Sequence, residues 1–201
     1  MTIALIDYGA GNLHSVHNAL IAAGADGVAI TTDADAVARA DRIVLPGVGA
    51  FGACAAALRA VPGMVEAIEA RVRQGGTPFL GICVGMQLMA TRGEELGMHQ
   101  GLGWIDGTVR ALAPADPAAK VPHMGWNDVV PTLSHPLIMP GEAYFLHGYA
   151  FEGDAVLATT DHGGTVTAAI GRDTMIGVQF HPEKSQRYGL DFLARFLAWR
   201  P

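Results

Sequence analysis

The chain has 201 residues, half of them hydrophobic (50%), and carries a formal net charge of −6 with no basic block. This length and apolar content predict one domain, residues 1–201, with a packed core. No positive surface would attract nucleic acid, and no segment reaches the ~20 apolar residues of a membrane helix, so we expect neither partner. The N-terminal residues contain no basic leader, which favours a soluble protein of the cytoplasm.

The N-terminal part alternates short apolar runs with helical patterns. A continuous apolar run at Ile3–Ile6 predicts a buried strand, and Val28–Ile30 and Arg42–Leu45 predict a second and a third strand. Apolar residues at helical spacing lie between the first two runs, and Asp33 is placed to cap a helix over residues 34–39. The order strand, helix, strand, helix, strand predicts a parallel sheet.

A glycine-rich loop, Pro46–Gly52, follows the third predicted strand. It lacks the Gly-Lys-Ser/Thr ending of a phosphate loop and a suitable ribose-binding acid, so its glycine spacing is weak evidence for a nucleotide site. Open α/β folds place their sites at this carboxyl edge of the sheet. The backbone N–H groups of the loop are therefore candidates for stabilising an oxyanion, and a merely tight connection is the alternative.

The segment Pro78–Gln87 has the pattern of a nucleophile elbow, with cysteine in place of the usual serine. An apolar strand meets a Gly-x-Cys-x-Gly turn that places Cys83 at the corner. Gly81 and Gly85 suit this turn because a side chain at either position would collide with the neighbouring strand or helix. We expect the following helix to continue through Met89, and its first amides to favour the thiolate form of Cys83. A buried cysteine beside two incidental glycines is the alternative.

The C-terminal half has a different pattern. Short alternating runs broken by glycine and proline, from about Gly103 to Gly171, predict antiparallel strands added to the parallel half. The run Met175–Phe180 predicts a further strand that ends at His181-Pro182-Glu183. Residues two apart in an extended chain face the same side, so the Glu183 carboxylate can orient the His181 imidazole as a base. An ordinary turn is the alternative.

Other reactive side chains do not form a second site. His14 and His17 share one helix face, but no third ligand has suitable spacing, so we predict no metal. Cys54 lies among alanines, and we interpret it as a core residue rather than a disulfide partner of Cys83. No cofactor is predicted.

The glycine-rich loop, the cysteine elbow and the strand ending in His-Pro-Glu occur in this order along the chain. Together they resemble the triad-type class I glutamine amidotransferases, and the finer match is to their glutaminase subunits of histidine biosynthesis. The resemblance covers essentially the whole chain. The segments that carry it are Asp7–Leu13, Pro46–Phe51, Gly81–Gln87, Val121–Asn127, Tyr144–Tyr149 and Gly177–Ser185.

The resemblance implies a three-layer, flavodoxin-like α/β fold in which antiparallel strands extend a parallel sheet. It also implies hydrolysis of L-glutamine through a thioester on Cys83, with His181 moving protons and Glu183 orienting His181. The implied oxyanion residues are Gly47, Val48, Gly49 and Val84. The implied substrate-binding residues are Gln87, Glu95, Gly148 and Tyr149. Two positions depart from the family pattern: Val84, where leucine is more usual, and Gly148, where a small polar residue is common.

The resemblance further implies a heterodimer with a separate (β/α)₈ cyclase subunit, which receives the ammonia and acts on a phosphorylated nucleotide. Direct transfer is reasonable because ammonia released into water is largely protonated and no longer nucleophilic. The positions expected at the interface or ammonia gate are Asn12, Met124, Trp126, Asn127, Tyr144 and Lys184. Ordinary core and loop packing is the alternative for these six residues.

Three alternatives to this function remain at the level of sequence. The chain could be a glutaminase of pyridoxal phosphate or anthranilate synthesis, a cysteine hydrolase or peptidase on a similar sheet, or a degenerate subunit that only binds. The segments Pro46–Phe51 and Val121–Asn127 favour histidine biosynthesis, and an intact Cys-His-Glu set opposes degeneracy. The family also suggests a hypothesis of regulation, in which Gly49 lets a loop peptide turn so that its N–H points inward only in the stimulated complex.

Overall fold

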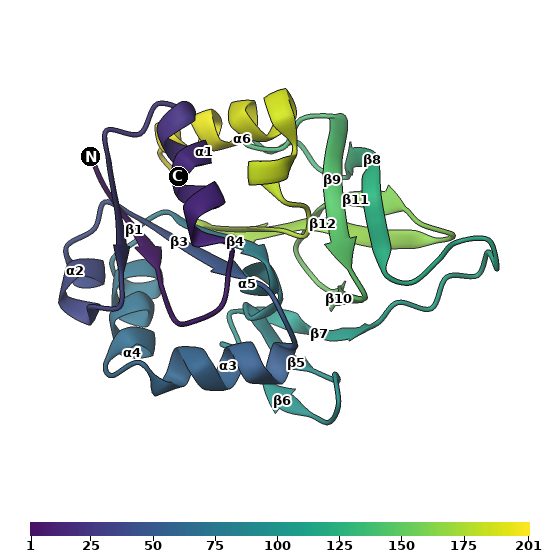
Figure 1. Cartoon of the computed structure of the whole chain (residues 1–201), viewed down its shortest axis with the longest axis horizontal. Coiled ribbons are helices and arrows are strands. Elements are labelled where there is room, and N and C mark those ends of the chain that lie inside the picture. The colour runs from purple at the N-terminus through teal and green to yellow at the C-terminus, as the bar shows by residue number, and fades with distance from the viewer.

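A nine-stranded mixed sheet forms the centre of the structure, a computed structural model that describes residues 1–201 (Figure 1). Its strand order is β2-β1-β3-β4-β13-β12-β11-β8-β9. The strands from β2 to β13 in this order run parallel, and those from β12 to β9 add antiparallel pairs. The bounds are β1 (Thr2–Ile6), β2 (Gly27–Thr31), β3 (Arg42–Gly47), β4 (Phe79–Cys83), β8 (His123–Pro131), β9 (Gly141–His147), β11 (Val156–Asp161), β12 (Thr165–Arg172) and β13 (Met175–Val178).

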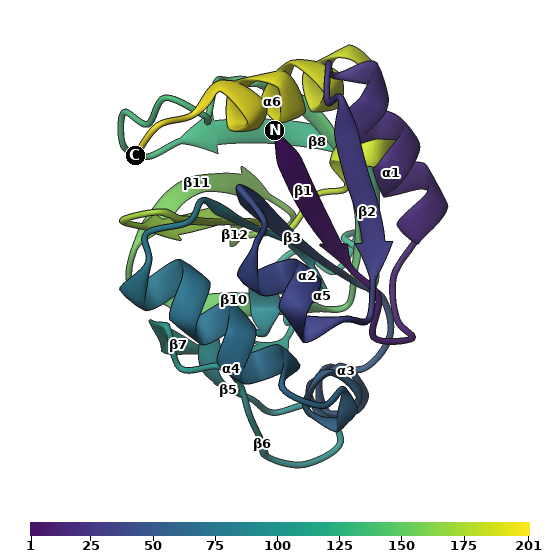
Figure 2. The ribbon, with the colours of Figure 1, turned by 90° about the vertical axis from the view of Figure 1, so that its left-hand side faces the viewer.

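Helices cover both faces of the parallel half and give the fold three layers (Figures 1 and 2). One face carries α1 and α6, and the other carries α2, α3 and α4. The helices are α1 (Leu13–Ala22), α2 (Ala34–Ala38), α3 (Phe51–Ala60), α4 (Met64–Glu69) with its π-helical extension η1 (Ala70–Gln74), α5 (Val84–Gln87), the 3₁₀ turn η2 (Pro182–Lys184) and α6 (Gln186–Ala198). The predicted α/β class, with antiparallel strands added to a parallel sheet, is confirmed.

The predicted N-terminal elements form for the expected reasons. β1, β3 and β4 lie inside the sheet, and their apolar runs are buried almost completely. The Asp33 side chain accepts a hydrogen bond of 2.9 Å from the amide of Asp35 and so caps α2. No single helix is long and apolar enough to cross a membrane; by length and composition alone, one bent pair, Phe51–Ala60 with Met64–Gln74, passes that test.

The expected continuation of the helix through Met89 is wrong. α5 ends at Gln87, and the strand β5 (Ala90–Gly93) begins after only two intervening residues. The carbonyls of Leu88 and Met89 accept hydrogen bonds from the amides of Leu102 and Trp104, at 2.7 and 2.9 Å, instead of continuing the helix. Long-range pairing therefore replaces the helical continuation that the local pattern predicted.

A second, four-stranded sheet, in the order β10-β7-β5-β6, lies beside the main sheet. Its strands are β5, β6 (His99–Gln100), β7 (Ile105–Ala111) and β10 (Tyr149–Gly153). The sequence analysis did not predict β5, β6 or β10, and β5, which lies before the segment expected to be antiparallel, pairs in parallel with β7. Tyr149, the first residue of β10, and Cys83, the last residue of β4, line the same cavity.

The glycines of the elbow are required by close backbone contacts. A Cβ atom at Gly85 would overlap the carbonyl oxygen of Leu45, and one at Gly81 would lie 2.6 Å from the carbonyl oxygen of Gly85. Backbone atoms of β3 cannot move aside without disrupting the sheet. The elbow thus packs against β3 with no room for a methyl group.

We expect Gly85→Ala to lower the free energy of unfolding by at least about 3 kcal/mol, because the methyl group would overpack a rigid backbone contact. Urea unfolding of the purified variant measures this. Gly148→Ala is the matched control, since a Cβ there would lie 3.8 Å from its nearest neighbour, on Val121. The control should unfold within about 0.5 kcal/mol of the parent chain. Equal stability of the two variants would contradict the assignment of this contact.

Candidate active site

Cys83 lies at the sharp corner between β4 and α5. Its backbone has φ 53° and ψ −112°, a conformation that costs a non-glycine residue about 1–3 kcal/mol. The side chain is buried, and its Sγ lies 3.9 Å from the carbonyl oxygen of Leu146. Register pairs Cys83 with Gly47 of β3, so the thiol and the glycine-rich loop emerge from the same edge of the sheet. The fold therefore holds a cysteine in a strained position beside the predicted oxyanion loop.

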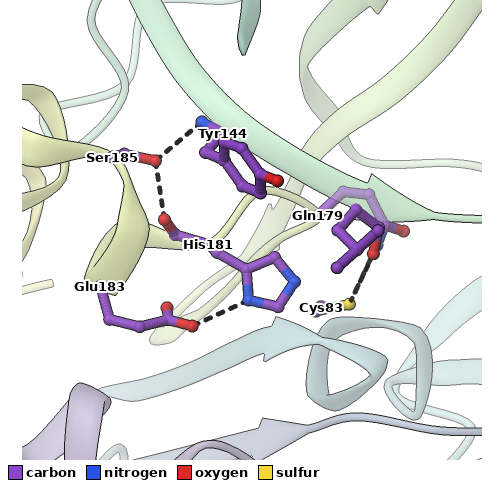
Figure 3. Close-up of polar contacts among 7 residues, drawn as sticks. Cys83, Tyr144, Gln179, His181, Glu183 and Ser185 are labelled. Atoms are coloured by element: carbon purple, nitrogen blue, oxygen red, sulfur yellow. Dashed lines mark hydrogen bonds and ion pairs between the residues drawn. The ribbon is translucent and has the colours of Figure 1, made fainter. Parts of the chain in front are cut away.

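His181 and Glu183 follow the neighbouring strand β13 and meet as predicted. The His181 Nδ1 lies 2.9 Å from the Glu183 Oε1, and the two side chains are only 4% and 1% exposed. Because the carboxylate accepts a hydrogen bond, Nδ1 carries the proton, and Nε2 is left for the Cys83 side of the ring. Figure 3 shows the imidazole between the carboxylate and the sulfur.

The backbone around His181 is fixed by strand β9 and by Ser185. The amide of His181 donates to the carbonyl of Tyr144 at 2.8 Å. The Ser185 hydroxyl donates to the carbonyl of His181 at 2.7 Å and accepts from the amide of Tyr144 at 2.9 Å (Figure 3). Ser185 was quoted in the sequence motif but given no role, and the structure shows that it ties the histidine to the sheet.

The electrostatic environment favours a charged His181. Burial lowers its pKa, but hydrogen bonds and charge interactions with Cys83 and Glu183 outweigh burial and raise the pKa to about 10. The ring therefore holds a proton at neutral pH. An imidazolium beside the sulfur stabilises negative charge there and is ready to protonate a leaving amine.

Gln179 is a site residue that the sequence analysis missed. It is fully buried, and its Nε2 donates to the Cys83 Sγ at 3.6 Å (Figure 3). Its Oε1 accepts from the Nε2 of Gln87 at 3.0 Å. The signal that could have found it is the two-residue spacing already used for His181 and Glu183, because Gln179 precedes His181 by two residues.

A cavity of about 410 Å³ contains both Cys83 and His181. This volume lies in the usual range for small-ligand sites. The cavity collects most of the predicted oxyanion and substrate residues, and Gly47 and Glu183 lie outside its lining. The lining consists of Val48, Gly49, Cys83, Val84, Gln87, Glu95, Pro122, Leu146, His147, Gly148, Tyr149, His181 and Lys184.

Two of the predicted substrate residues already have protein partners. Gln87 uses its two N–H groups on Gln179 and on the carbonyl of Tyr149, which leaves its Oε1 to accept from a ligand. The Glu95 Oε2 accepts a 2.7 Å hydrogen bond from the amide of Phe51, at the first turn of α3. Glu95 thus connects the wall of the cavity to the end of the glycine-rich loop, and its contact with an ammonium group stays a prediction.

Two buried side chains donate hydrogen bonds to the backbone of the glycine-rich loop. The Tyr8 hydroxyl donates to the carbonyl of Pro46 at 2.9 Å, and the Cys54 thiol donates to the carbonyl of Val48 at 3.5 Å. In the trans peptide that follows Val48, the N–H of Gly49 points away from Cys54. Gly49 has φ +112°, a conformation that favours glycine. The turning of this peptide in a complex stays a prediction.

The residues predicted at a partner interface lie around β8, β9 and η2. Met124 and Trp126 are 66% and 47% exposed, so the alternative of core packing is wrong for both. Trp126 contacts Tyr144 edge-on at 6.1 Å, and the Lys184 Nζ lies 5.9 Å from the centre of the Tyr144 ring. Asn12 and Asn127 are half-buried. Of these six residues, Lys184 lines the cavity, and Met124 and Trp126 are its exposed apolar members.

Comparisons with known proteins agree with this geometry. The family model for class-I glutamine amidotransferases matches residues 4–198, and the chain belongs to that family. Several curated relatives carry the name imidazole glycerol phosphate synthase subunit HisH. The chain is 63% identical to the protein of this name from Zymomonas mobilis, over 100% of this chain and 97% of that one. It is 53% identical to that from Ruegeria pomeroyi, over the full length of both.

Solved structures at low identity show the same fold. A crystal structure described as a glutamine amidotransferase aligns with a TM-score of 0.73 at 16% identity, covering 96% of this chain and 98% of that one. The structure of PurLQS from Thermotoga maritima aligns with a TM-score of 0.71 at 16% identity, covering 98% and 97%. These alignments confirm the flavodoxin-like amidotransferase fold.

Proposed function

We propose that this chain is the glutaminase subunit of an imidazole glycerol phosphate synthase in histidine biosynthesis. It would hydrolyse L-glutamine to glutamate and ammonia and pass the ammonia to a separate (β/α)₈ cyclase subunit. The observation that carries this proposal is the single cavity that joins Cys83 and His181, with Glu183 behind the histidine, in a chain 63% identical to a HisH subunit. We place the protein in the cytoplasm, where reducing conditions keep Cys54 and Cys83 as free thiols.

The chemistry follows from the positions of these groups. The Cys83 sulfur attacks the carboxamide carbon of glutamine and forms a tetrahedral intermediate. Its oxyanion would be stabilised by the Val84 amide and, in the active form, by amides of the loop at Gly47, Val48 and Gly49. His181 donates its proton to the nitrogen, the carbon–nitrogen bond breaks, and ammonia leaves a thioester on Cys83.

Water completes the cycle. His181, now neutral, takes a proton from the water that attacks the thioester carbon, and glutamate leaves as the sulfur recovers its electron pair. Glu183 keeps the Nδ1 proton in place throughout, so that Nε2 performs both transfers. The substrate's amino-acid end is assigned to Gln87 and Glu95, with backbone contacts at Gly148 and Tyr149.

The partner would dock over the rim of the cavity. The exposed Met124 and Trp126, the Tyr144–Lys184 pair, and Asn12 and Asn127 form the proposed surface. Exposed methionine and tryptophan are typical of binding surfaces. Docking there would cover the cavity and keep the ammonia out of water.

Reconstitution with the cyclase subunit tests this function. We expect the two chains to form a heterodimer, and glutamate release to rise at least about tenfold when the cyclase holds its nucleotide ligand, because the ligand shifts the loop toward its active form. Glutamate release is measured with and without the cyclase and its ligand. Equal rates under all conditions would contradict the regulated glutaminase role, and failure to form any complex would contradict the partner.

A further inference from the structure

A continuous line of hydrogen bonds connects strand β8 to the Cys83 sulfur. Asn127 Nδ2 lies 3.1 Å from His123 Nε2, and His123 Nδ1 lies 3.1 Å from His147 Nε2. His147 Nδ1 lies 2.9 Å from the carbonyl oxygen of Tyr149. That carbonyl also accepts from Gln87, which donates to Gln179, which donates to the Cys83 Sγ.

The contacts at the two ends of this line determine which ring nitrogen of each histidine carries the proton. The carbonyl of Tyr149 can only accept, so His147 carries its proton on Nδ1 and accepts at Nε2. His123 must then donate from Nδ1 and accept at Nε2, which matches the amide donor of Asn127. The second N–H of Asn127 donates to the carbonyl of Asp161 at 2.7 Å. All donors from Asn127 to Tyr149 point inward, toward the cavity.

The two histidines are built into the core and not free to turn. Both are buried. The His123 ring is stacked between Phe145, at 4.7 Å, and His162, at 4.1 Å. Burial and the neighbouring histidines lower the pKa of His123 to about 3, and burial first of all lowers that of His147 to about 4. Both rings therefore stay neutral at physiological pH and keep the tautomers that the line requires.

We propose that His123 and His147 are positioning residues of the glutaminase reaction. Through the Tyr149 carbonyl they hold the Gln87 amide, which in turn holds the Gln179 amide against the Cys83 sulfur, and through Asn127 they connect this arrangement to β8. The assignment of the reaction and of a partner at β8 rests on the proposed function. The positioning of Gln179, which donates to the sulfur, does not rest on the proposed function, because it follows from the hydrogen bonds alone.

The proposal explains why two buried histidines that take no part in the proton transfers lie beside the site, with His147 in the wall of the cavity and His123 hydrogen-bonded to it. Replacing a buried donor leaves the facing acceptor without a partner, and that acceptor then shifts or recruits water. A shift at His147 would move the Tyr149 carbonyl and with it both glutamine amides. Small displacements of positioning groups slow a reaction strongly without weakening substrate binding to the same degree.

Two substitutions at His123 separate the hydrogen bond from the packing. Asparagine keeps an N–H donor near the position of Nδ1, whereas leucine has nearly the same size as asparagine and no donor. His135→Leu is the matched control, since His135 is a half-buried histidine beside Trp199, outside the cavity lining and outside this line. Each variant is assayed for glutamate release with the cyclase and its ligand, and for alkylation of Cys83 by iodoacetamide in the isolated chain.

We expect His123→Leu to lower kcat at least about tenfold while KM changes less than about threefold. His123→Asn and His135→Leu should keep kcat within about threefold of the parent. Alkylation of Cys83 should slow in His123→Leu and stay near the parental rate in His123→Asn. Equal losses in the leucine and asparagine variants, or parental values in both assays for the leucine variant, would overturn the proposal.

The alkylation assay tests this proposal independently of the proposed function, because it needs neither glutamine nor a cyclase. If the parent chain releases no glutamate with any cyclase, the proposed function fails. The alkylation rates of the parent, His123→Leu and His123→Asn still decide whether the line of hydrogen bonds positions the Cys83 sulfur. If His123→Leu does not fold, Asn127→Ala removes the outer donor without opening the core. This variant should also slow alkylation in the isolated chain, and an unchanged rate would overturn the proposal.

Discussion

Replacing Cys83 with alanine is expected to abolish glutamine-dependent synthesis by the reconstituted complex, with a loss of at least about 10⁴-fold in rate. The sulfur forms the thioester, and no other side chain of the cavity can take over this covalent step, because Cys54 is buried beneath the glycine-rich loop and outside the cavity lining. Product formation from the nucleotide substrate, with glutamine as nitrogen donor, measures this loss.

Ammonium salts provide the internal control for the same variant. Ammonia supplied from solution bypasses the glutaminase site, so Cys83→Ala should support ammonia-dependent synthesis at close to the parental rate. This result would show that the complex and the cyclase remain intact. Survival of the glutamine-dependent reaction in Cys83→Ala would remove the thiol from its assigned role.

Replacing Glu183 with glutamine is expected to lower kcat for glutamine hydrolysis by roughly 10²- to 10⁴-fold. The substitution keeps the shape of the side chain but removes the anion whose Oε1 lies 2.9 Å from the His181 Nδ1 and keeps the proton on that nitrogen. The ring can then adopt the wrong tautomer, and its charged form loses a stabilising partner. Steady-state glutamate release by the reconstituted complex measures the change, and an unchanged kcat would contradict the orienting role.

The same variant has a predicted effect on stability. The folded-state pKa of His181 is raised to about 10 from an ordinary value of 6.5, so its contribution is fully present below about pH 6.5 and is lost as pH rises through about 10. Removing the Glu183 charge brings this pKa down. The stability of Glu183→Gln should therefore fall less steeply than that of the parent between about pH 6.5 and 10, as urea unfolding across this range would show. A parallel decline in both proteins would contradict the proposed ion pair.

Local sequence patterns predicted the parts of the site that local geometry determines. The elbow needs glycines beside Cys83 because β3 packs against it, and the two-residue spacing of an extended chain places His181 and Glu183 on one side. The same spacing also reaches Gln179, which was overlooked because a glutamine at the end of an apolar strand has no obvious reactive role.

The remaining features depend on contacts that no local pattern contains. α5 is short because the carbonyls of Leu88 and Met89 pair with residues 102 and 104, and not with the next helical turn. His123 and His147 meet because the antiparallel β8–β9 register places them directly opposite one another. Such cross-strand pairs are far apart in the sequence and can be identified only once the register of the strands is known.

The account depends most directly on the Cys83 sulfur attacking the carboxamide carbon of glutamine. The measurement that tests this is covalent labelling of the full chain, with its cyclase, by a diazo ketone analogue of glutamine, followed by peptide mass spectrometry. We predict one label per chain, on Cys83 and not on Cys54, and protection by excess glutamine. A label on Cys54, or labelling of Cys83 that glutamine does not slow, would contradict the account.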